Sequence, residues 1–416
     1  MLMSTTKREH INKLIFVVRH GFYSSITTMV PAVVVHGYLL QKGIDYASLG
    51  VIGTISSVAI AASTFLFAGL ADRFKSFKSF KTALAVAVLG LSLKGGTLLF
   101  LCIFLPDAKP TLIFAVYAIA TAVYDSLNGI KYLLQAILIV RISSTKRYGR
   151  LQGAAVLIAT VLSVASGALV AYISGIYSIE GVIIRLSVAS CAAVVISCSL
   201  TMLFLDVNPE KAAERNPPVD SPFKAISKVI KIPQSKMLVL TSILRGVQLS
   251  GIYFFSAIGV TKFGAGSHII GFIAMALPVA EVSSAMFLML LQPRLGSGKM
   301  AFYAALFAVS GALIISFARV EILYAIGYGV IHFSHTLISN SLGVGVMEMV
   351  PADIVGRAMA VKQTIVQISN AFFTFVFGAV LQSTMPLLLF IVAGTALFSN
   401  GMYFYQACKR FSEREA

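Results

Sequence analysis

Charged side chains inside long apolar stretches are the residues of this sequence whose types could do chemistry. They are Arg19, Asp125, Lys131, Arg245, Glu281, His332 and His335. A charge in the hydrocarbon core of a bilayer costs about 2.5–3.5 kcal/mol on insertion scales, so each is a candidate functional group. A buried carboxylate or a histidine can take up and release a proton near working pH, which predicts proton coupling by Asp125, Glu281 and His332. Arg19 and Arg245 can hold a carboxylate or phosphate if both face one cavity.

Helical spacing arranges many of these residues into polar stripes. At about 100° per residue, three groups of polar residues each fall on one helix face. The groups are Asp125, Asn128, Tyr132 and Gln135; Tyr328, His332, His335 and Ser339; and Ser242, Arg245, Gln248 and Ser256. Polar stripes on otherwise apolar helices should face one another rather than lipid. The spacing therefore predicts a polar cavity between helices.

Several of these residues also have a purely structural explanation. Arg19 lies about two turns from a predicted helix end, so its side chain can snorkel to the membrane surface, and Lys94 can do the same or pair locally. Lys131 can serve only to neutralise a neighbouring carboxylate. His332 and His335 can hydrogen-bond across helices as packing residues. The two histidines lack an evident third ligand, so no metal site is predicted.

Composition places these residues in a membrane protein. Of the 416 residues, 58% are hydrophobic and 12% are charged, about half the charged fraction of a soluble domain. Runs of about 20 mostly apolar residues, long enough to cross a bilayer as a helix, lie at 14–40, 48–71, 82–105, 111–140, 150–175, 181–205, 236–260, 268–291, 300–318, 322–348, 357–383 and 386–407. The runs lack two-residue alternation, and open sheet edges cannot face lipid. The sequence predicts an all-α polytopic protein with twelve transmembrane helices, and ten or eleven remain open.

Lysine and arginine residues are unevenly distributed between the predicted spans. Alternate connections are rich in them, whereas the connections between hold only Lys42, Lys109, Lys262 and Arg319. The positive-inside rule then places the basic connections and both termini in the cytoplasm. The expected location of the protein is the plasma (inner) membrane. The net charge of +17 gathers on this membrane face, so it does not indicate a nucleic-acid partner.

One long polar stretch, Asp206–Ser235, divides the apolar runs into two sets of six. It contains prolines and then a basic amphipathic piece, Phe223–Ile232. The predicted units are an N-terminal six-helix bundle at 1–205, a cytoplasmic linker with a short amphipathic helix at 206–235, and a C-terminal six-helix bundle at 236–416. A constant offset also aligns Tyr117 with Tyr324 and Arg150 with Arg357. Internal repeats of this kind are common in secondary transporters.

The loop after the second predicted span, AGLADRFKSFK at Ala68–Lys78, carries the most specific local signal. It is similar to the G-x-L-A-D-R-x-G-R-R signature of the major facilitator superfamily. The matching residues are Leu70, Ala71, Asp72 and Arg73, and Ala68 and Lys75 replace the two family glycines. The whole chain resembles this family in its six plus six spans, basic central loop and cytoplasmic ends. The resemblance implies that Asp72 and Arg73 form a conformational signature, with Asp72 near a helix N-terminus in one state only.

Further elements of the family narrow the branch. Asp125–Gly129 resembles the R-x-x-Q-G element, with aspartate in place of arginine, and the Gly-Pro element of many drug antiporters is missing around Gly167. Glu281 in span 8 and His332 in span 10 resemble the proton-linked sugar symporter branch, although the absence of tryptophan argues against a sugar. Family architecture places spans 1, 4, 7 and 10 around a central cavity. The resemblance therefore implies substrate binding by Arg19, Tyr23, Asn128, Lys131, Arg245, Gln248, Tyr328 and His335.

These features together predict a proton-linked secondary transporter that moves a small polar or anionic organic solute by alternating access, and not an enzyme. An efflux pump for a drug, siderophore or metabolite is the first alternative, and a non-transporting membrane sensor is the second. The expected partners are the solute, protons and the lipid bilayer, with the protein as a monomer. No cofactor or metal is expected, because the four cysteines have no metal-binding spacing.

Overall fold

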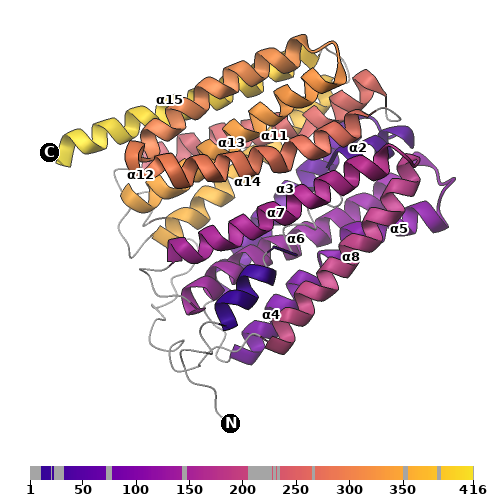
Figure 1. Ribbon diagram of the computed structural model, residues 1–416, viewed down its shortest axis with the longest axis horizontal. Helices are drawn as coiled ribbons and strands as arrows, with labels where there is room; N and C mark the ends of the chain where they lie inside the picture. The colour runs from indigo at the N-terminus through magenta and orange to yellow at the C-terminus, as the bar shows by residue number, and fades with distance from the viewer. Residues whose placement is uncertain are drawn as a thin grey trace.

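The regular structure of the described chain is helical. The computed structural model describes residues 11–19, 21–22, 32–71, 77–142, 148–204, 227, 231, 235–264, 268–349, 355–381 and 386–415, and no strand occurs in these residues. Residues 11–19 are helical. The helices that follow are α2 (Ala32–Gln41), α3 (Tyr46–Ala71), α4 (Phe77–Leu89), α5 (Ser92–Phe104), α6 (Pro110–Ile142), α7 (Tyr148–Ser174), α8 (Ile179–Phe204), α11 (Ser235–Phe263), α12 (Ile269–Phe317), α13 (Glu321–Met349), α14 (Val355–Leu381) and α15 (Pro386–Glu415). Figure 1 shows them packed side by side along one direction.

Nine helices in the described part of the chain are long and apolar enough to cross a membrane. Two of them are the arms of α12, which reverse at Gly296, where φ is 75° and glycine is favoured. Another, Ser79–Phe104, joins α4 and α5 across a short break. The prediction of an all-α polytopic membrane protein is confirmed. The number twelve and the division at 206–235 stay predictions, because most of that linker, Phe223–Ile232 included, lies outside the described residues.

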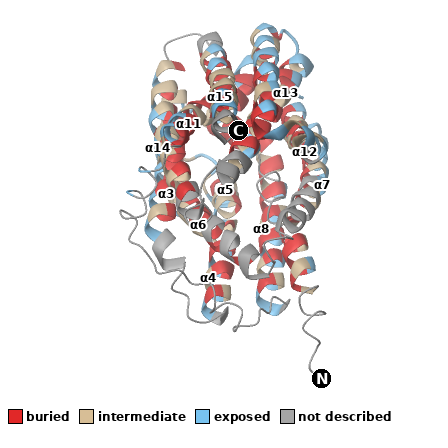
Figure 2. Cartoon of the chain, turned by 90° about the vertical axis from the view of Figure 1, so that its left-hand side faces the viewer, coloured by how far each residue is buried: buried red, intermediate tan, exposed pale blue. Residues whose placement is uncertain are grey.

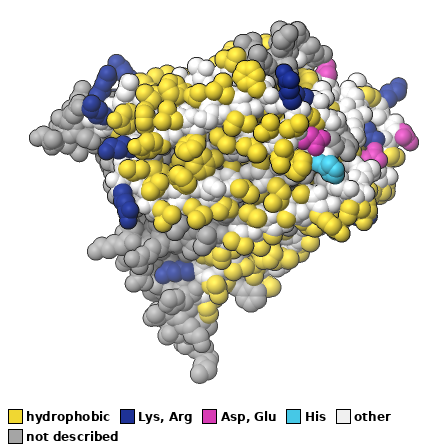
Figure 3. Space-filling model, turned by 45° about the horizontal axis from the view of Figure 1, so that its top comes forward, with side chains coloured by type: hydrophobic (Ala, Val, Ile, Leu, Met, Phe, Trp, Pro, Cys, Tyr) yellow, Lys and Arg dark blue, Asp and Glu magenta, His cyan; other side chains and the backbone are white. Residues whose placement is uncertain are grey.

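The surface of the helix bundle is suited to lipid. Large apolar side chains such as Phe104, Ile119 and Phe317 are exposed, which would be unusual over so wide an area in a soluble monomer. Figure 3 shows a broad hydrophobic face with charged side chains near its two ends. In Figure 2, which looks from the end where α15 finishes, buried residues lie mainly on the helix faces turned into the bundle. Apolar side chains thus cover the outside of the bundle and charged side chains lie near its two ends, as expected of a protein that crosses a bilayer.

Hydroxyl side chains inside these helices are largely satisfied by their own backbone. Ser57, Thr64 and Thr201 each donate to the carbonyl oxygen four residues earlier, at 2.6–2.9 Å. This i−4 bond lets a serine or threonine lie in an apolar helix without an unpaired polar group. Polar residues in these segments therefore do not disrupt the helices that position the site.

Early and late helices approach closely at one end of the bundle, which we call the closed end. It is the end where α2 finishes at Gln41, α3 begins at Tyr46 and α11 finishes at Phe263. Here α3 and α14 pack through Gly50 and Gly378, and a Cβ added at Gly378 would lie 2.8 Å from the Cα atom of Gly50. The absence of side chains at both positions allows the two backbones to touch.

Hydrogen bonds between early and late helices gather in the same half of the bundle. The Tyr46 hydroxyl donates to Thr261 Oγ1 at 2.7 Å, joining α3 to α11. The Asn370 amide donates to Ser57 Oγ at 2.7 Å, and Thr54 Oγ1 donates to the Ala371 carbonyl at 3.0 Å, joining α3 to α14. These bonds hold the closed end together.

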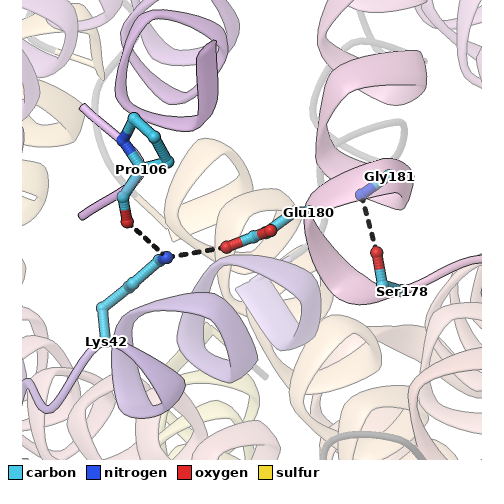
Figure 4. Close-up of polar contacts among 5 residues, drawn as sticks. All are labelled: Lys42, Pro106, Ser178, Glu180 and Gly181. Atoms are coloured by element: carbon cyan, nitrogen blue, oxygen red, sulfur yellow. Dashed lines mark hydrogen bonds and ion pairs between the residues drawn. The ribbon is translucent and has the colours of Figure 1, made fainter. Parts of the chain in front are cut away.

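Loops at the closed end are also linked within the first group of helices. Lys42 Nζ donates to the Pro106 carbonyl at 2.7 Å and pairs with Glu180 Oε1 at 2.7 Å, and the Gly181 amide donates to Ser178 Oγ at 3.4 Å (Figure 4). The ion pair is partly exposed, so its contribution to stability is only about 0–1 kcal/mol. Its main effect is to fix the end of α2 beside the start of α8.

We expect Gly378→Ala to destabilise the closed end, because the new methyl group would meet the backbone of α3 rather than a movable side chain. Overpacking of this kind costs roughly 1–3 kcal/mol. The apparent unfolding temperature in detergent should therefore fall. Gly96→Ala in α5 is the matched control, because a Cβ there meets nothing within 4 Å. Equal effects of the two substitutions would contradict the close packing of α3 on α14.

Candidate functional site

The middle of α6 carries a buried polar cluster. Asp125, Asn128 and Lys131 lie on one face of this helix and expose 7%, 9% and 1% of their surface. Lys131 Nζ donates to Asn128 Oδ1 at 2.6 Å. Ser56 on α3 is a second polar neighbour of the Asp125 carboxylate, and Lys94 and Lys131 supply positive charge close to it. Two of the four residues of the predicted stripe on span 4, Asp125 and Asn128, are thus directed into the protein. The side chains of Tyr132 and Gln135 lie outside the described part of the structure.

Arg19 lies in the same half of the chain and is also buried, with 1% of its surface exposed. Its Nη1 atom donates to Thr201 Oγ1 on α8 at 3.5 Å, and its guanidinium lies 5.9 Å from the centre of the Phe16 ring. A snorkelling side chain would instead be exposed. The positive charge of Arg19 also acts on Lys131, so two cations of this half lie close together.

A cavity of about 220 Å³ lies beside Asp125, toward the closed end. Its lining comes from α2, α3, α5, α6 and α11. The polar and aromatic side chains around it include His36, Ser56, Lys94, Tyr117, Asp125 and Tyr253. A space of this size with several polar walls can hold ordered water. The cavity therefore lies between the Asp125 carboxylate on α6 and α11, the first helix of the second group.

A second cluster of polar and charged side chains, half-buried to buried, lies on α11, α13 and α14. The charge of Arg245 on α11 acts on His335 of α13 and on Lys362 of α14. Lys362 is 3% exposed. On α13, the rings of Tyr328 and His332 lie 4.3 Å apart, between centroids. The structure thus brings together four of the residues predicted for the second half, Arg245, Tyr328, His332 and His335, and adds Lys362 to them.

Glu281 lies near this second cluster, on the first arm of α12. Its charge acts on Tyr328, and its side chain is partly buried. Gln248 is placed differently from Arg245 on the same helix, because its Nε2 atom donates to the Ala396 carbonyl of α15 at 3.2 Å. Its amide is already engaged in helix packing. Tyr23, Asp72 and Arg73 lie outside the described residues.

Sequence reasoning missed three residues that the structure adds to these clusters, namely His36, Lys94 and Lys362. Lys94 has the signal of a charge in an apolar run, but its position near the outer half of its span favoured a local role. Lys362 lies within two turns of the basic end of a predicted span. Its charge was therefore not recognised as one inside the apolar run. His36 lies in an apolar run like His332 and could have been found by the same criterion. Among the described residues, no group of three histidine, cysteine or acidic side chains could hold a metal ion.

The architecture and the buried charges define a class of protein, a polytopic helical membrane transporter. Several solved structures share the fold. A variant of the nucleoside transporter NupG has a TM-score of 0.69 and 15% identity, over 94% of this chain and 98% of that one. The D-xylose-proton symporter has a TM-score of 0.69 and 12% identity, over 96% and 97%. The human organic anion transporter MFSD10 (TETRAN) has a TM-score of 0.64 and 14% identity, over 95% and 99%.

The sequence model of the Major Facilitator Superfamily matches residues 15–374. The chain belongs to the major facilitator superfamily, and it is a transporter and not an enzyme. A search of curated protein sequences finds no match to the chain. The family predicted from the signature loop is therefore confirmed, while the binding and coupling roles of individual residues stay predictions.

We expect Lys362→Met to stabilise the protein in the absence of solute. Among the described residues, the charge that acts on Lys362 is that of Arg245. Burial of an ammonium group and repulsion by a like charge both cost free energy, and an apolar side chain of similar volume removes both costs. The apparent unfolding temperature of the purified protein should rise. Lys236→Met at the exposed start of α11 is the control and should leave it nearly unchanged. A lower unfolding temperature for Lys362→Met would show that this lysine is a stabilising element.

Proposed function

We propose that this transporter is proton-linked and moves a small organic anion by alternating access. The observation that carries the proposal is that cations outnumber carboxylates in the two clusters of the described residues, inside the helix bundle. Arg19, Lys94, Lys131, Arg245 and Lys362 lie among the two clusters, against the carboxylates of Asp125 and Glu281. Buried like charges are costly unless an opposite charge accompanies them. An anionic solute would supply that charge.

The arrangement supports binding between the two groups of helices. Arg19 and Lys131 interact on one side, and Arg245 and Lys362 interact on the other. Guanidinium and ammonium groups make strong charge-assisted hydrogen bonds to carboxylate or phosphate oxygens. An anion that contacts both pairs would favour a state in which the halves close around it. This differential binding is what a solute needs to drive a conformational change.

Proton coupling is assigned to Asp125, with Glu281 and His332 as further candidates. Asp125 lies between Lys94 and Lys131 and beside the cavity. Its charge determines how strongly these lysines attract an anion, so proton uptake and solute binding would be linked through one carboxylate. Two neighbours of the same fold are described as a proton symporter and an organic anion transporter. At 12–14% identity they share only the fold, so the proposal depends on the residues.

The proposed orientation places the closed end at the outer face of the plasma (inner) membrane and both termini in the cytoplasm. The basic connections support it, because they alternate with connections that contain few cations. The described conformation is then closed to the outside. We also propose that the protein acts as a monomer, with one chain forming the complete pathway.

Transport in proteoliposomes tests the proposal. Currents on a supported membrane should appear when a pH gradient is imposed with members of a panel of carboxylates, sugar phosphates and other organic anions. Arg245→Gln should abolish the currents, because the second cluster loses its guanidinium, whereas Arg294→Gln at the exposed turn between the arms of α12 should keep them. If no solute of the panel is transported in either direction, the transporter proposal is refuted. If Arg245→Gln keeps an unchanged affinity for the transported anion, the anion site is refuted.

Asp125→Asn should separate coupling from movement. Asparagine keeps the shape and the hydrogen-bonding capacity near Ser56 and Asn128 but cannot carry the proton. Accumulation driven by a pH gradient should fall at least tenfold, while exchange of labelled for unlabelled solute continues. Glu321→Gln, at the start of α13 and away from both clusters, should keep both activities. Full gradient-driven accumulation by Asp125→Asn would exclude this residue as the coupling group.

A further inference from the structure

His36 lies where the early and late helices meet at the closed end. It is on α2, and 3% of its surface is exposed. Its Nδ1 atom forms a 2.9 Å hydrogen bond with Ser256 Oγ of α11. Its ring packs edge-on against Tyr253, with centroids 4.7 Å apart, and the Tyr253 hydroxyl donates to the Leu49 carbonyl at 3.2 Å. One histidine thus forms part of the contact that closes this end.

The same histidine lines the 220 Å³ cavity that contains Asp125. The groups that face this space come from several helices. The polar ones, besides His36, are Lys94 on α5, Tyr117, Thr121, Tyr124 and Asp125 on α6, Ser56 on α3 and Tyr253 on α11. On the sides of α2 formed by α8 and α12, the neighbouring Gly37 is contacted by the apolar side chains of Ile179 and Ile270. His36 therefore borders a polar space that leads to Asp125, within an otherwise apolar wall.

The surroundings allow a neutral imidazole in the closed arrangement and oppose a charged one. Lys94 is the nearby cation that acts on His36, and the ring has almost no access to water. Burying an uncompensated imidazolium beside another positive charge costs free energy through both desolvation and repulsion. A proton on His36 therefore favours separation of α2 from α11, and closure favours its loss.

We propose that His36 is a proton-coupling residue of the outer gate, which takes up a proton when the closed end opens and passes it to Asp125 when that end closes. The transfer runs from an imidazolium N–H through water in the cavity to a carboxylate oxygen of Asp125. It leaves a neutral imidazole, which can accept the Ser256 hydrogen bond, and a carboxylic acid at Asp125. The inference deepens the proposed proton-linked function and adds a residue to it.

A distance measurement tests this gate without knowledge of the solute. Spin labels are attached at Asp107→Cys and Arg319→Cys, exposed positions at the closed end in the α5–α6 and α12–α13 connections. The background replaces Cys102, Cys191, Cys198 and Cys408 by serine. Double electron–electron resonance in nanodiscs is recorded as the pH is lowered from about 8 to about 5, the interval in which a histidine gains its proton. A longer-distance population should grow severalfold as the pH falls.

Three further substitutions decide which group carries the response. His36→Gln keeps a side chain that can reach Ser256 but cannot titrate, and its distances should not change with pH. Ser256→Ala removes the hydrogen bond but keeps the histidine, so the longer-distance population should be larger at every pH and still respond to acid. Asp125→Asn should retain the response. A wild-type protein without a pH response, or a response that survives in His36→Gln, would overturn the proposal.

The outcome is separable from that of the proposed function. Anion transport without an acid-driven opening would refute the gate and leave the transporter proposal intact. An acid-driven opening in a protein that moves no solute would support the gate and refute the transporter proposal. If His36→Gln does not purify as a monodisperse protein, the pH response of Ser256→Ala relative to wild type still decides, because loss of that response would contradict titration at His36.

Discussion

The low polarity of the bilayer is the constraint on which the rest of this structure depends. Every backbone polar group that crosses it must be paired within its own segment, so the long apolar runs become helices. Hydroxyl side chains such as Ser57 and Thr64 are bonded to the preceding turn for the same reason. Charges that remain at this depth are turned inward, and that places Asp125, Lys131 and Lys362 in the protein interior.

Small residues determine where the helices can touch. Because lipid chains are as apolar as the helix surfaces, association depends on close contact and on hydrogen bonds between helices. Gly50 and Gly378 allow α3 and α14 to meet backbone to backbone, and Asn370, Tyr46 and His36 add polar links beside them. The closed end combines both kinds of contact. In the cycle that we propose, these contacts would have to separate when this end opens.

The charge cluster around Asp125 and the closed end are connected through one cavity. The cavity beside Asp125 is bordered by His36, which takes part in closure, and by Lys94, which acts on both residues. A change of charge at any of them alters the balance between the open and closed arrangements. Solute, proton and gate can thus affect one another over short distances. The family relationship accounts for the scaffold, whereas the binding and coupling roles of these residues are our proposal.

The sequence by itself determined the helices, the membrane setting and the family, because hydropathy over about 20 residues and a signature loop are local properties. It also indicated that Asp125, Lys131, Arg245 and His332 face the interior, since a charge in an apolar run far from a helix end is costly in contact with lipid. Only the tertiary structure decided the partners. It placed His36 against Ser256, Gln248 against Ala396 and Lys362 beside Arg245. Such pairings join residues far apart in the chain, and helical periodicity gives the face of one helix but not which helix lies opposite.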